Sequence, residues 1–468
     1  TLFPYTTLFR SEVADVNLAY SVTMAPLVVK DKVIIGVGGG EYGIRGFIAA
    51  YDVDTGEEAW RFWTIPGPGE PGHETWDDDD WEHGGASVWV TGSYDADLNL
   101  TYWGVGNPGP DWNPGQRPGD NLYSDAVVAL DADTGELVWH FQFVHHTVWD
   151  YDPPAAPNLI DITVDGRQIE AVAQITKQGF TFVFDRATGE PVWPIEERPV
   201  PQSTVPGERT SPTQPFPTRP PVYLTNGSLE ADLIDFTEEL RAEALEIYGQ
   251  HTAGPLYTPP ALGGNIVRPG WSGGANWWGA AFDPQTARPY VPSWAHFSFV
   301  VMEPGDPARS DLRIRPRVSN LPGPQGLPLF KPPYSQLVAL DMNAGEALWS
   351  VPLGDGPRDH EALRGLDLAP LGNYDKSGGP LLTKTLLVHA LTTGGTDGGP
   401  QLVAYDKATG AVVAAIDLPS GAIGTPMTYM LESRQYIAVT VGGEAPYLVA
   451  LTLPPRTMTG ISVPPSGR

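Results

Sequence analysis

The stretch AYDVDTGEEAW (50–60) decides the fold, because related copies of it recur along the chain. Alternating apolar residues predict a strand, the Asp and Thr side chains predict a capped turn, and Gly suits the left-handed position of that turn. The other copies are ALDADTGELVW (129–139), VFDRATGEPVW (183–193), ALDMNAGEALW (339–349) and AYDKATGAVVA (404–414). Four of the five copies place a Trp eight positions after the Asp, on the returning strand, where we expect it to face a neighbouring sheet: Trp60, Trp139, Trp193 and Trp349.

Two weaker copies, SYDADLNLTYWG (93–104) and AFDPQTARPYVP (281–292), lie between the clear ones. Hairpins repeated at intervals of a few tens of residues are typical of the blades of a β-propeller. A pair of β-sandwiches is the alternative, but it gives no reason for an internal repeat. The sequence therefore predicts an all-β propeller, whose loops bring distant residues to one central funnel.

Composition narrows the classes of function. The 468 residues include 53 Gly and 49 Pro, which favours turn-rich β structure. A net charge of −28 argues against nucleic-acid binding, because phosphate recognition needs clustered Lys and Arg. The absence of Cys excludes disulfides, thiolate metal sites and a covalent c-type haem within these residues. No apolar run reaches the length of a membrane span.

The domain organisation is one propeller over residues 12–468 with an inserted excursion at about 196–270. The excursion contains a Pro-rich extended segment (199–221) and a segment with helical spacing (230–250). The apolar residues of that second segment predict a packing stripe at Leu233, Phe236, Leu240 and Leu245. Residues 1–11, TLFPYTTLFRS, resemble a translated sequencing adapter, so we expect them to be foreign to the protein and leave them out of the fold.

A series of motifs in fixed order resembles the pyrroloquinoline quinone (PQQ) dependent dehydrogenases, the quinoprotein alcohol and sugar dehydrogenases. The motifs are GGGEYGIRGFIAAYDVDTG (38–56), WEHGGASVWV (81–90), GNPGPDW (106–112), HHTVWDYDPPAAP (145–157), ITKQGFTFVFDRATG (175–189), GGANWWGAAFDP (273–284) and LPSGAIGTPMTY (418–429). The resemblance runs from about residue 12 onward. It implies an eight-bladed propeller and a chain that begins near the third blade, which leaves six blades. Some motifs are most similar to the glucose branch (145–157) and others to the alcohol branch (106–112), so both stay open.

The resemblance also implies a metal site. Glu41, Asn107 and Asp150 match the family's metal ligands, and oxygen donors of this kind suit a hard cation. Asp152 adds a fourth candidate ligand. An acid at its place resembles lanthanide-using enzymes in the alcohol branch and enzymes with divalent ions in the sugar branch. We expect calcium, with a lanthanide as the alternative.

The same resemblance assigns the chemistry. Asp150 matches the catalytic base that takes the hydroxyl proton of the substrate while hydride passes to the quinone C5, and Lys177 matches the basic residue at the quinone oxygens. The cation would polarise the C5 carbonyl as a Lewis acid. Trp89 matches the surface on which the quinone stacks. The other expected cofactor contacts are Thr23, Gly39, Gly40, Ser87, Asn276 and Trp277.

Two functions from different classes are compatible with the repeats. The first is a PQQ-dependent dehydrogenase of an alcohol or aldose, which passes electrons to a separate cytochrome c or quinone. Its resemblance implies a periplasmic or other extracytoplasmic location and allows a homodimer. The second is a non-catalytic propeller that resembles the outer-membrane assembly lipoproteins. Such a scaffold has no reason to hold Glu41, Asn107, Asp150 and Lys177 together, so the sequence favours the dehydrogenase.

Overall fold

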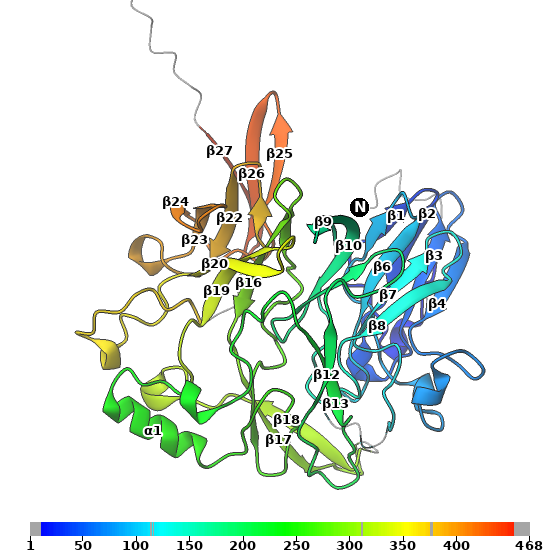
Figure 1. The fold of residues 1–468 in the computed structure, drawn as a ribbon, viewed down its shortest axis with the longest axis horizontal. Helices are drawn as coiled ribbons and strands as arrows, with labels where there is room; N and C mark the ends of the chain where they lie inside the picture. Colours follow the sequence, from blue (N-terminus) through cyan, green and yellow to red (C-terminus); the bar gives the residue numbers. More distant parts are fainter. Residues whose placement is uncertain (1–10, 113–114, 116, 310–311, 375–377, 454–468) are drawn as a thin grey trace, which may run out of the picture.

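Small antiparallel sheets built from consecutive strands make up most of the structure (Figure 1). The computed structural model describes residues 11–112, 115, 117–309, 312–374 and 378–453. Ten of the eleven residues that we expected to be foreign, 1–10, lie outside this range. Within it, no helix is both long enough and apolar enough to cross a membrane.

Six of the sheets follow one another along the chain; the first five contain the predicted repeats, with each weaker copy in the same sheet as a clear one, and the sixth contains none. The first is β1 (Leu27–Val29), β2 (Lys32–Gly36), β3 (Phe47–Asp52) and β4 (Glu58–Trp63), and the second is β5 (Ser93–Asp95), β6 (Leu100–Val105), β7 (Ala126–Asp131) and β8 (Leu137–Gln142). The third is β9 (Asn158–Val164), β10 (Arg167–Ile175) and β11 (Thr181–Asp185), and the fourth is β15 (Ala281–Asp283), β16 (Arg288–Trp294), β19 (Ser335–Asp341) and β20 (Glu346–Pro352). The fifth is β21 (Leu381–Leu382), β22 (Leu386–Leu391), β23 (Gln401–Asp406) and β24 (Val412–Asp417), and the sixth is β25 (Met427–Leu431), β26 (Arg434–Val441) and β27 (Tyr447–Thr452).

The repeated turn has the chemistry that the sequence predicts. In the first copy, Asp52 Oδ1 accepts hydrogen bonds from the backbone N–H of Asp54 (3.0 Å) and Thr55 (2.8 Å), and Thr55 Oγ1 donates to the same oxygen. Gly56 follows with φ 73°, a conformation that costs glycine little. The copies that begin at Asp131, Asp185 and Asp406 repeat this pattern.

The Trp of each repeat packs on the turn of the next one along the chain. Trp60 Nε1 donates to Ala132 O at 3.1 Å, and Trp139 Nε1 donates to Arg186 O at 3.1 Å. A Cβ on the turn glycine of the next repeat would lie within about 3 Å of the indole, which is too close for any other residue. The four pairs are Trp60 with Gly135 (2.4 Å), Trp139 with Gly189 (2.7 Å), Trp193 with Gly345 (3.0 Å) and Trp349 with Gly410 (2.8 Å). The prediction that these Trp residues face a neighbouring sheet is confirmed.

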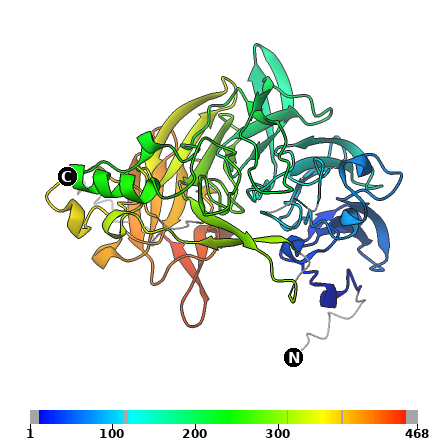
Figure 2. The same cartoon turned by 90° about the horizontal axis from the view of Figure 1, so that it is seen from below.

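The hydrophobic core lies between successive sheets. Strand residues alternate between the two faces, as Ile48 and Ala50 face the second sheet while Phe47 and Ala49 face the other side. Separate clusters join the first sheet to the second, the second to the third, the third to the fourth, the fourth to the fifth and the fifth to the sixth. Figure 2 shows the sheets in chain order along an arc, from blue through green to orange. This is the arrangement of propeller blades.

The excursion predicted over about 196–270 pairs with a second insertion, which sequence analysis missed. Strands β12 (Ile195–Pro199) and β13 (Thr213–Pro217) form a ribbon, and β14 (Asn265–Val267) pairs with β17 (Ser298–Pro304), which pairs with β18 (Ile314–Ser319). Strands β17 and β18 belong to a second insertion, between β16 and β19. They supply one wall of the cavity described below.

The helix of the excursion is shorter than its predicted stripe. α1 (Glu238–Tyr248) begins after Thr237, whose Oγ1 accepts a hydrogen bond from Leu240 N at 3.1 Å. Leu233 and Phe236 therefore precede the helix. Leu240 is buried, but Leu245 is 37% exposed, and Ala244 takes the inward position one turn after Leu240.

Candidate active site

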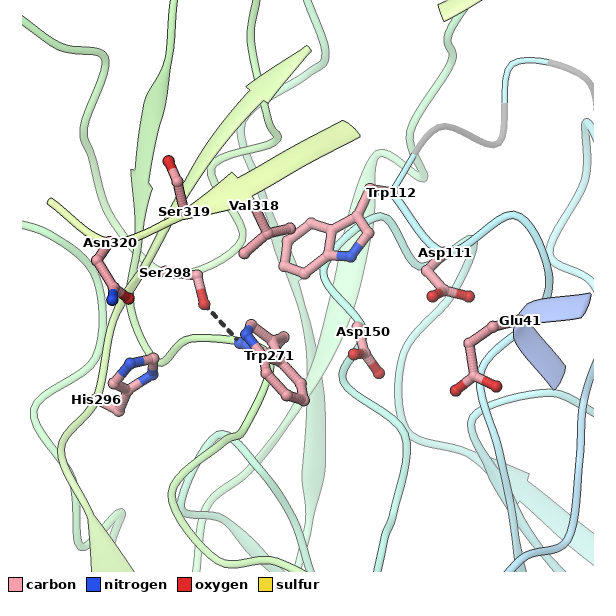
Figure 3. A pocket seen from close by; sticks show the side chains of 10 residues that line it. All are labelled: Glu41, Asp111, Trp112, Asp150, Trp271, His296, Ser298, Val318, Ser319 and Asn320. Atoms are coloured by element: carbon pink, nitrogen blue, oxygen red, sulfur yellow. Dashed lines mark hydrogen bonds between the residues drawn. The ribbon is translucent and has the colours of Figure 1, made fainter. Parts of the chain in front are cut away.

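A cavity of about 440 Å³ lies where the loops of several sheets meet (Figure 3). Carboxylates gather on one side of it, and Ser298, His296 and Asn320 lie on the other. Its lining residues are Glu41, Asp111, Trp112, Asp150, Trp271, His296, Ser298, Val318, Ser319 and Asn320. The cavity thus joins two of the predicted ligands, Glu41 and Asp150, to an acid that was not predicted, Asp111.

Each acidic residue comes from a different inter-strand loop. Glu41 lies on a short 3-10 helix (Gly40–Tyr42) between β2 and β3, Asp111 follows β6, and Asp150 follows β8. Backbone hydrogen bonds fix the first two loops to each other through the segment between them: Gly85 N donates to Ile44 O (2.8 Å), Ala86 N to Asn107 O (3.0 Å) and Gly109 N to Gly84 O (2.9 Å). The propeller topology therefore brings together carboxylates that are far apart in the sequence.

Lys177 holds the two acids of the WDYD motif. Its Nζ donates to Asp150 O (2.9 Å) and Asp150 Oδ1 (3.0 Å), and lies 2.5 Å from Asp152 Oδ1. The second oxygen of Asp152 accepts a hydrogen bond from Trp89 Nε1 at 3.0 Å. Asp150 has φ 58°, an uncommon conformation for a non-glycine residue that is concentrated at functional sites.

The pKa values of Asp150 and Lys177 are both raised, as the net effect of burial and neighbouring charges. Burial raises the pKa of Asp150 well above its usual value, and the neighbouring Asp152 and Asp111 raise it further, although Lys177 opposes this effect. Burial alone would lower the pKa of Lys177, but the two aspartates outweigh it and raise the pKa. Lys177 therefore stays charged, and it is the counter-ion of this side of the cavity.

Asn107 and Asp111 form a second polar pair. Asn107 Nδ2 donates to Asp111 Oδ1 at 2.5 Å, and Asn107 is 5% exposed. Burial, together with the charges of Glu41 and Asp152, raises the pKa of Asp111 to about 7. Within the described residues, neither Glu41 nor Asp111 forms a salt bridge, in contrast to Asp150 and Asp152.

Several of the predicted cofactor contacts lie beside this group. Thr23 Oγ1 donates to Trp89 O at 2.9 Å, and a Cβ on Gly40 would lie 3.0 Å from Ser87 Oγ. A Cβ on Gly39 would lie 2.4 Å from Ala19 O, so both glycines are needed for packing inside the protein. Their predicted contact with a flat cofactor stays a prediction.

The loop with Asn276 and Trp277 reaches the site through two glycines. Gly274 N donates to Lys177 O at 2.6 Å, and a Cβ on Gly273 would lie 2.3 Å from Lys177 Cγ. Asn276 is buried and accepts a hydrogen bond from Trp277 N at 2.8 Å, whereas Trp277 is 47% exposed. These glycines place the loop directly against the Lys177 stem.

Sequence analysis missed the opposite wall and Asp111. Asp111 stands in the GNPGPDW motif, four positions after Asn107, and an acid there could have been noticed. The wall residues Ser298, Val318 and Ser319 lie on β17 and β18, which carry no copy of the repeat. Nothing in the local sequence marks them as neighbours of Asp150.

The donor set fits a hard cation through carboxylate and amide oxygens. Among the described residues, no group of three Asp, Glu, His or Cys side chains is arranged to hold a metal ion. Glu41, Asp150 and Asp152 therefore do not form such a group together, and the two oxygens of Asp152 contact Lys177 and Trp89. The remaining predicted set combines Glu41 and Asp150 with the amide of Asn107.

Comparison with known proteins identifies the family of the chain. The family described as PQQ, "Glucose/ethanol/alcohol dehydrogenase, beta-propeller domain", matches residues 9–437. This chain belongs to the PQQ-dependent dehydrogenase family. The family match confirms the resemblance inferred from the order of the motifs.

Individual relatives come from both branches. The chain is 30% identical to the quinoprotein glucose dehydrogenase of Escherichia coli (strain K12), over 95% of this chain and 59% of the relative. It is 32% identical to the quinohemoprotein alcohol dehydrogenase ADH-IIG of Pseudomonas putida, over 92% of this chain and 54% of the relative. A europium-containing methanol dehydrogenase has a similar structure, with a TM-score of 0.68, 26% identity and coverage of 93% of this chain and 68% of the other. The chain thus spans somewhat more than half of the length of these two curated relatives.

Proposed function

We propose that this chain is the catalytic propeller of a PQQ-dependent dehydrogenase that oxidises an alcohol or aldose. The observation that carries the proposal is the cavity lined by Glu41, Asp111 and Asp150. The buried cation Lys177 donates to Asp150, and Asn107 donates to Asp111. A scaffold propeller needs the Trp–Gly contacts between sheets but gains nothing from burying Asp150 and Asp152 at their centre, because each costs desolvation free energy.

The residues present fit both groups that the family uses. Glu41, Asn107 and Asp150 would hold calcium or a lanthanide, with Asp152 as a further candidate. Trp89, Lys177, Thr23 and Ser87 would hold PQQ, with Gly39, Gly40, Asn276 and Trp277 as further contacts. When bound, PQQ supplies the hydride acceptor at its C5 position and the cation supplies Lewis acidity.

The protein's own residues have separable tasks. Asp150 takes the hydroxyl proton of the substrate, since its carboxylate faces the cavity. Lys177 orients Asp150 through two hydrogen bonds, to its backbone and its carboxylate. Because a cation would lower the raised pKa of Asp150, metal binding would also keep the base deprotonated.

The wall opposite the acids favours an alcohol over an aldose. A second cavity of about 310 Å³ shares His296 and Asn320 with the first. Its other lining residues are mostly apolar, including Phe297, Leu321, Pro322, Leu327, Pro328 and Tyr374. A sugar needs a polar partner for each hydroxyl group, whereas an alcohol with an apolar or aromatic chain would bury that chain here.

Electrons leave the site for a separate acceptor, a cytochrome c or a quinone. The absence of Cys within the sequence rules out a covalently attached c-type haem on these residues. An extracytoplasmic location and a homodimeric assembly belong to the same proposal.

The test is reconstitution of the purified protein with PQQ and either Ca²⁺ or La³⁺. We expect reduction of an electron-accepting dye that depends on both additions, with higher kcat/KM for hexanol and benzyl alcohol than for glucose. A reversed order of substrates would reject the apolar-alcohol assignment alone. The absence of dye reduction with either metal, together with loss of all quinone absorbance on desalting, would reject the enzyme.

A further inference from the structure

Asn107 is the only predicted metal ligand that is an amide, and an amide has two different ends. Its Nδ2 can only donate hydrogen bonds and its Oδ1 can only accept them or bind a cation. A rotation of the group by 180° would present the wrong end, and X-ray density alone seldom separates the two. Whether Asn107 can act as a ligand therefore depends on what fixes this rotation.

Asp111 is the group that fixes it. Both hydrogen bonds that the Asn107 side chain donates start from Nδ2, one to Asp111 Oδ1 at 2.5 Å and a long one to Pro108 O at 3.5 Å. An ionised carboxylate offers no donor, so Asp111 in that form selects the nitrogen end of the amide and turns Oδ1 away from itself. Asn107 is 5% exposed and Asp111 is half-buried.

The loop that carries Asp111 is fixed on both sides. Trp112 is buried in the core between the second and third sheets. The buried guanidinium of Arg117 donates to Pro110 O (3.2 Å) and to Thr147 O (2.9 Å), and so ties this loop to the one that carries Asp150. Asp111 is thus held at a set position relative to both neighbouring loops.

We propose that Asp111 is a positioning residue that orients the Asn107 carbonyl toward the bound cation. This inference rests on the proposed function, because it presumes the cation site. Asp111 acts through Asn107 and is not itself a ligand: its Oδ1 is occupied by the amide, and it forms no three-carboxylate group with Glu41 and Asp150 among the described residues.

The experiment measures cation affinity rather than turnover. Terbium luminescence, excited through the Trp112 and Trp271 side chains in the cavity wall, reports direct binding to the protein, and competition with Ca²⁺ gives the calcium Kd. Removal of an outer partner of a metal ligand typically weakens binding by about 10–100-fold. We expect that loss for Asp111→Ala.

Asp111→Asn separates the hydrogen bond from the charge. Its side-chain carbonyl can still accept from Asn107 Nδ2, but its NH2 group can also donate to Oδ1, so it keeps the contact without selecting one rotation. We therefore expect a loss of affinity clearly smaller than that of Asp111→Ala. The matched control for a lost charge is Asp77→Ala, at an exposed position, with unchanged affinity. Equal losses in Asp111→Asn and Asp111→Ala would overturn the proposal, because charge alone would then explain the effect.

A double-mutant cycle gives the decisive result. In an Asn107→Ala background, Asp111→Ala should change the Kd no further, since the residue through which it acts is absent. Additive losses would overturn the positioning role. A wild-type protein that binds neither Tb³⁺ nor Ca²⁺ would instead remove the cation site of the proposed function, so the two failures are distinguishable.

Discussion

The acids of the site form two groups that differ in how their negative charge is balanced: Asp150 and Asp152 beside Lys177 are the lysine side. Glu41 and Asp111, with Asn107, are the amide side. On the lysine side, Asp150 and Asp152 share the buried ammonium group of Lys177. On the amide side, Asp111 contacts the neutral amide of Asn107, Glu41 is exposed, and neither acid forms a salt bridge within the described residues. The lysine side carries its own positive charge. Among the described residues no cation contacts the two acids of the amide side, so a bound cation would be most stabilising there.

The largest loss of activity is expected from a substitution of Asp150, which faces the cavity on the lysine side. Asp150→Asn keeps the shape but cannot accept the substrate proton, so we expect kcat to fall by about 10²–10⁴-fold. The measurement is dye reduction at saturating PQQ and metal, with Tb³⁺ binding measured in parallel. Turnover within threefold of the wild type, with metal bound, would reject Asp150 as the base.

The next variant removes the charge balance of the lysine side. Lys177→Met leaves two buried carboxylates without a counter-ion, and we expect a loss of about 3–5 kcal/mol in the free energy of unfolding. The loss should shrink as the pH is lowered, because a carboxylate with a raised folded pKa stabilises the fold only when it is protonated. Denaturant titrations at two pH values measure both effects.

The control for that variant is an exposed ion pair of similar length. Lys30 Nζ lies 2.9 Å from Asp133 Oδ1, and both side chains are nearly half exposed. Lys30→Met should lower the free energy of unfolding far less than Lys177→Met does, since exposed pairs are solvated and screened. If the two substitutions cost the same, burial of the lysine side is not what distinguishes it.

A smaller loss of stability is expected when a neighbouring substitution displaces Lys177 than when Lys177 itself is replaced. In Gly273→Ala, the new Cβ would lie 2.3 Å from Lys177 Cγ, at a backbone φ of 68°. We expect a destabilisation of about 1–3 kcal/mol from the clash alone, with reduced kcat because Lys177 shifts from Asp150. Gly279→Ala is the matched control, because Gly279 has φ 71° and no atom within 4 Å of the added Cβ. Equal destabilisation by the two substitutions would mean that backbone strain alone is responsible.

Features carried by the repeated motif could be predicted from the sequence, whereas contacts between loops outside the repeat could not. The turn at Asp52 and the packing of Trp60 on Gly135 follow from residue types at fixed spacing, so the sheets and their order could be predicted. The contact of Asp152 with Trp89 joins loops from separate sheets, and the sequence indicates only that both loops reach the centre.

The other differences have similar physical causes. The insertion with β17 and β18 carries no repeat, so its role as the opposite wall was not visible. Asp111 was visible as an acid in a Gly- and Pro-rich turn, where such residues usually serve the turn itself. Only the 2.5 Å distance to Asn107 distinguishes it.

The smallest effect is expected from Asp152, the partner of Asp150 on the lysine side. Its two oxygens are occupied by Lys177 and Trp89, it is 1% exposed, and it does not line the cavity. Asp152→Asn should therefore change the Ca²⁺ Kd by less than about tenfold, below the loss typical of a removed ligand or outer partner, and lower kcat less than Asp150→Asn does. Because Asn can still accept from Trp89, the indole should stay in place, which near-ultraviolet circular dichroism can check. A loss of calcium affinity as large as that of Asn107→Ala would instead make Asp152 a direct ligand, and the lysine side would then supply two of the cation's oxygens rather than one.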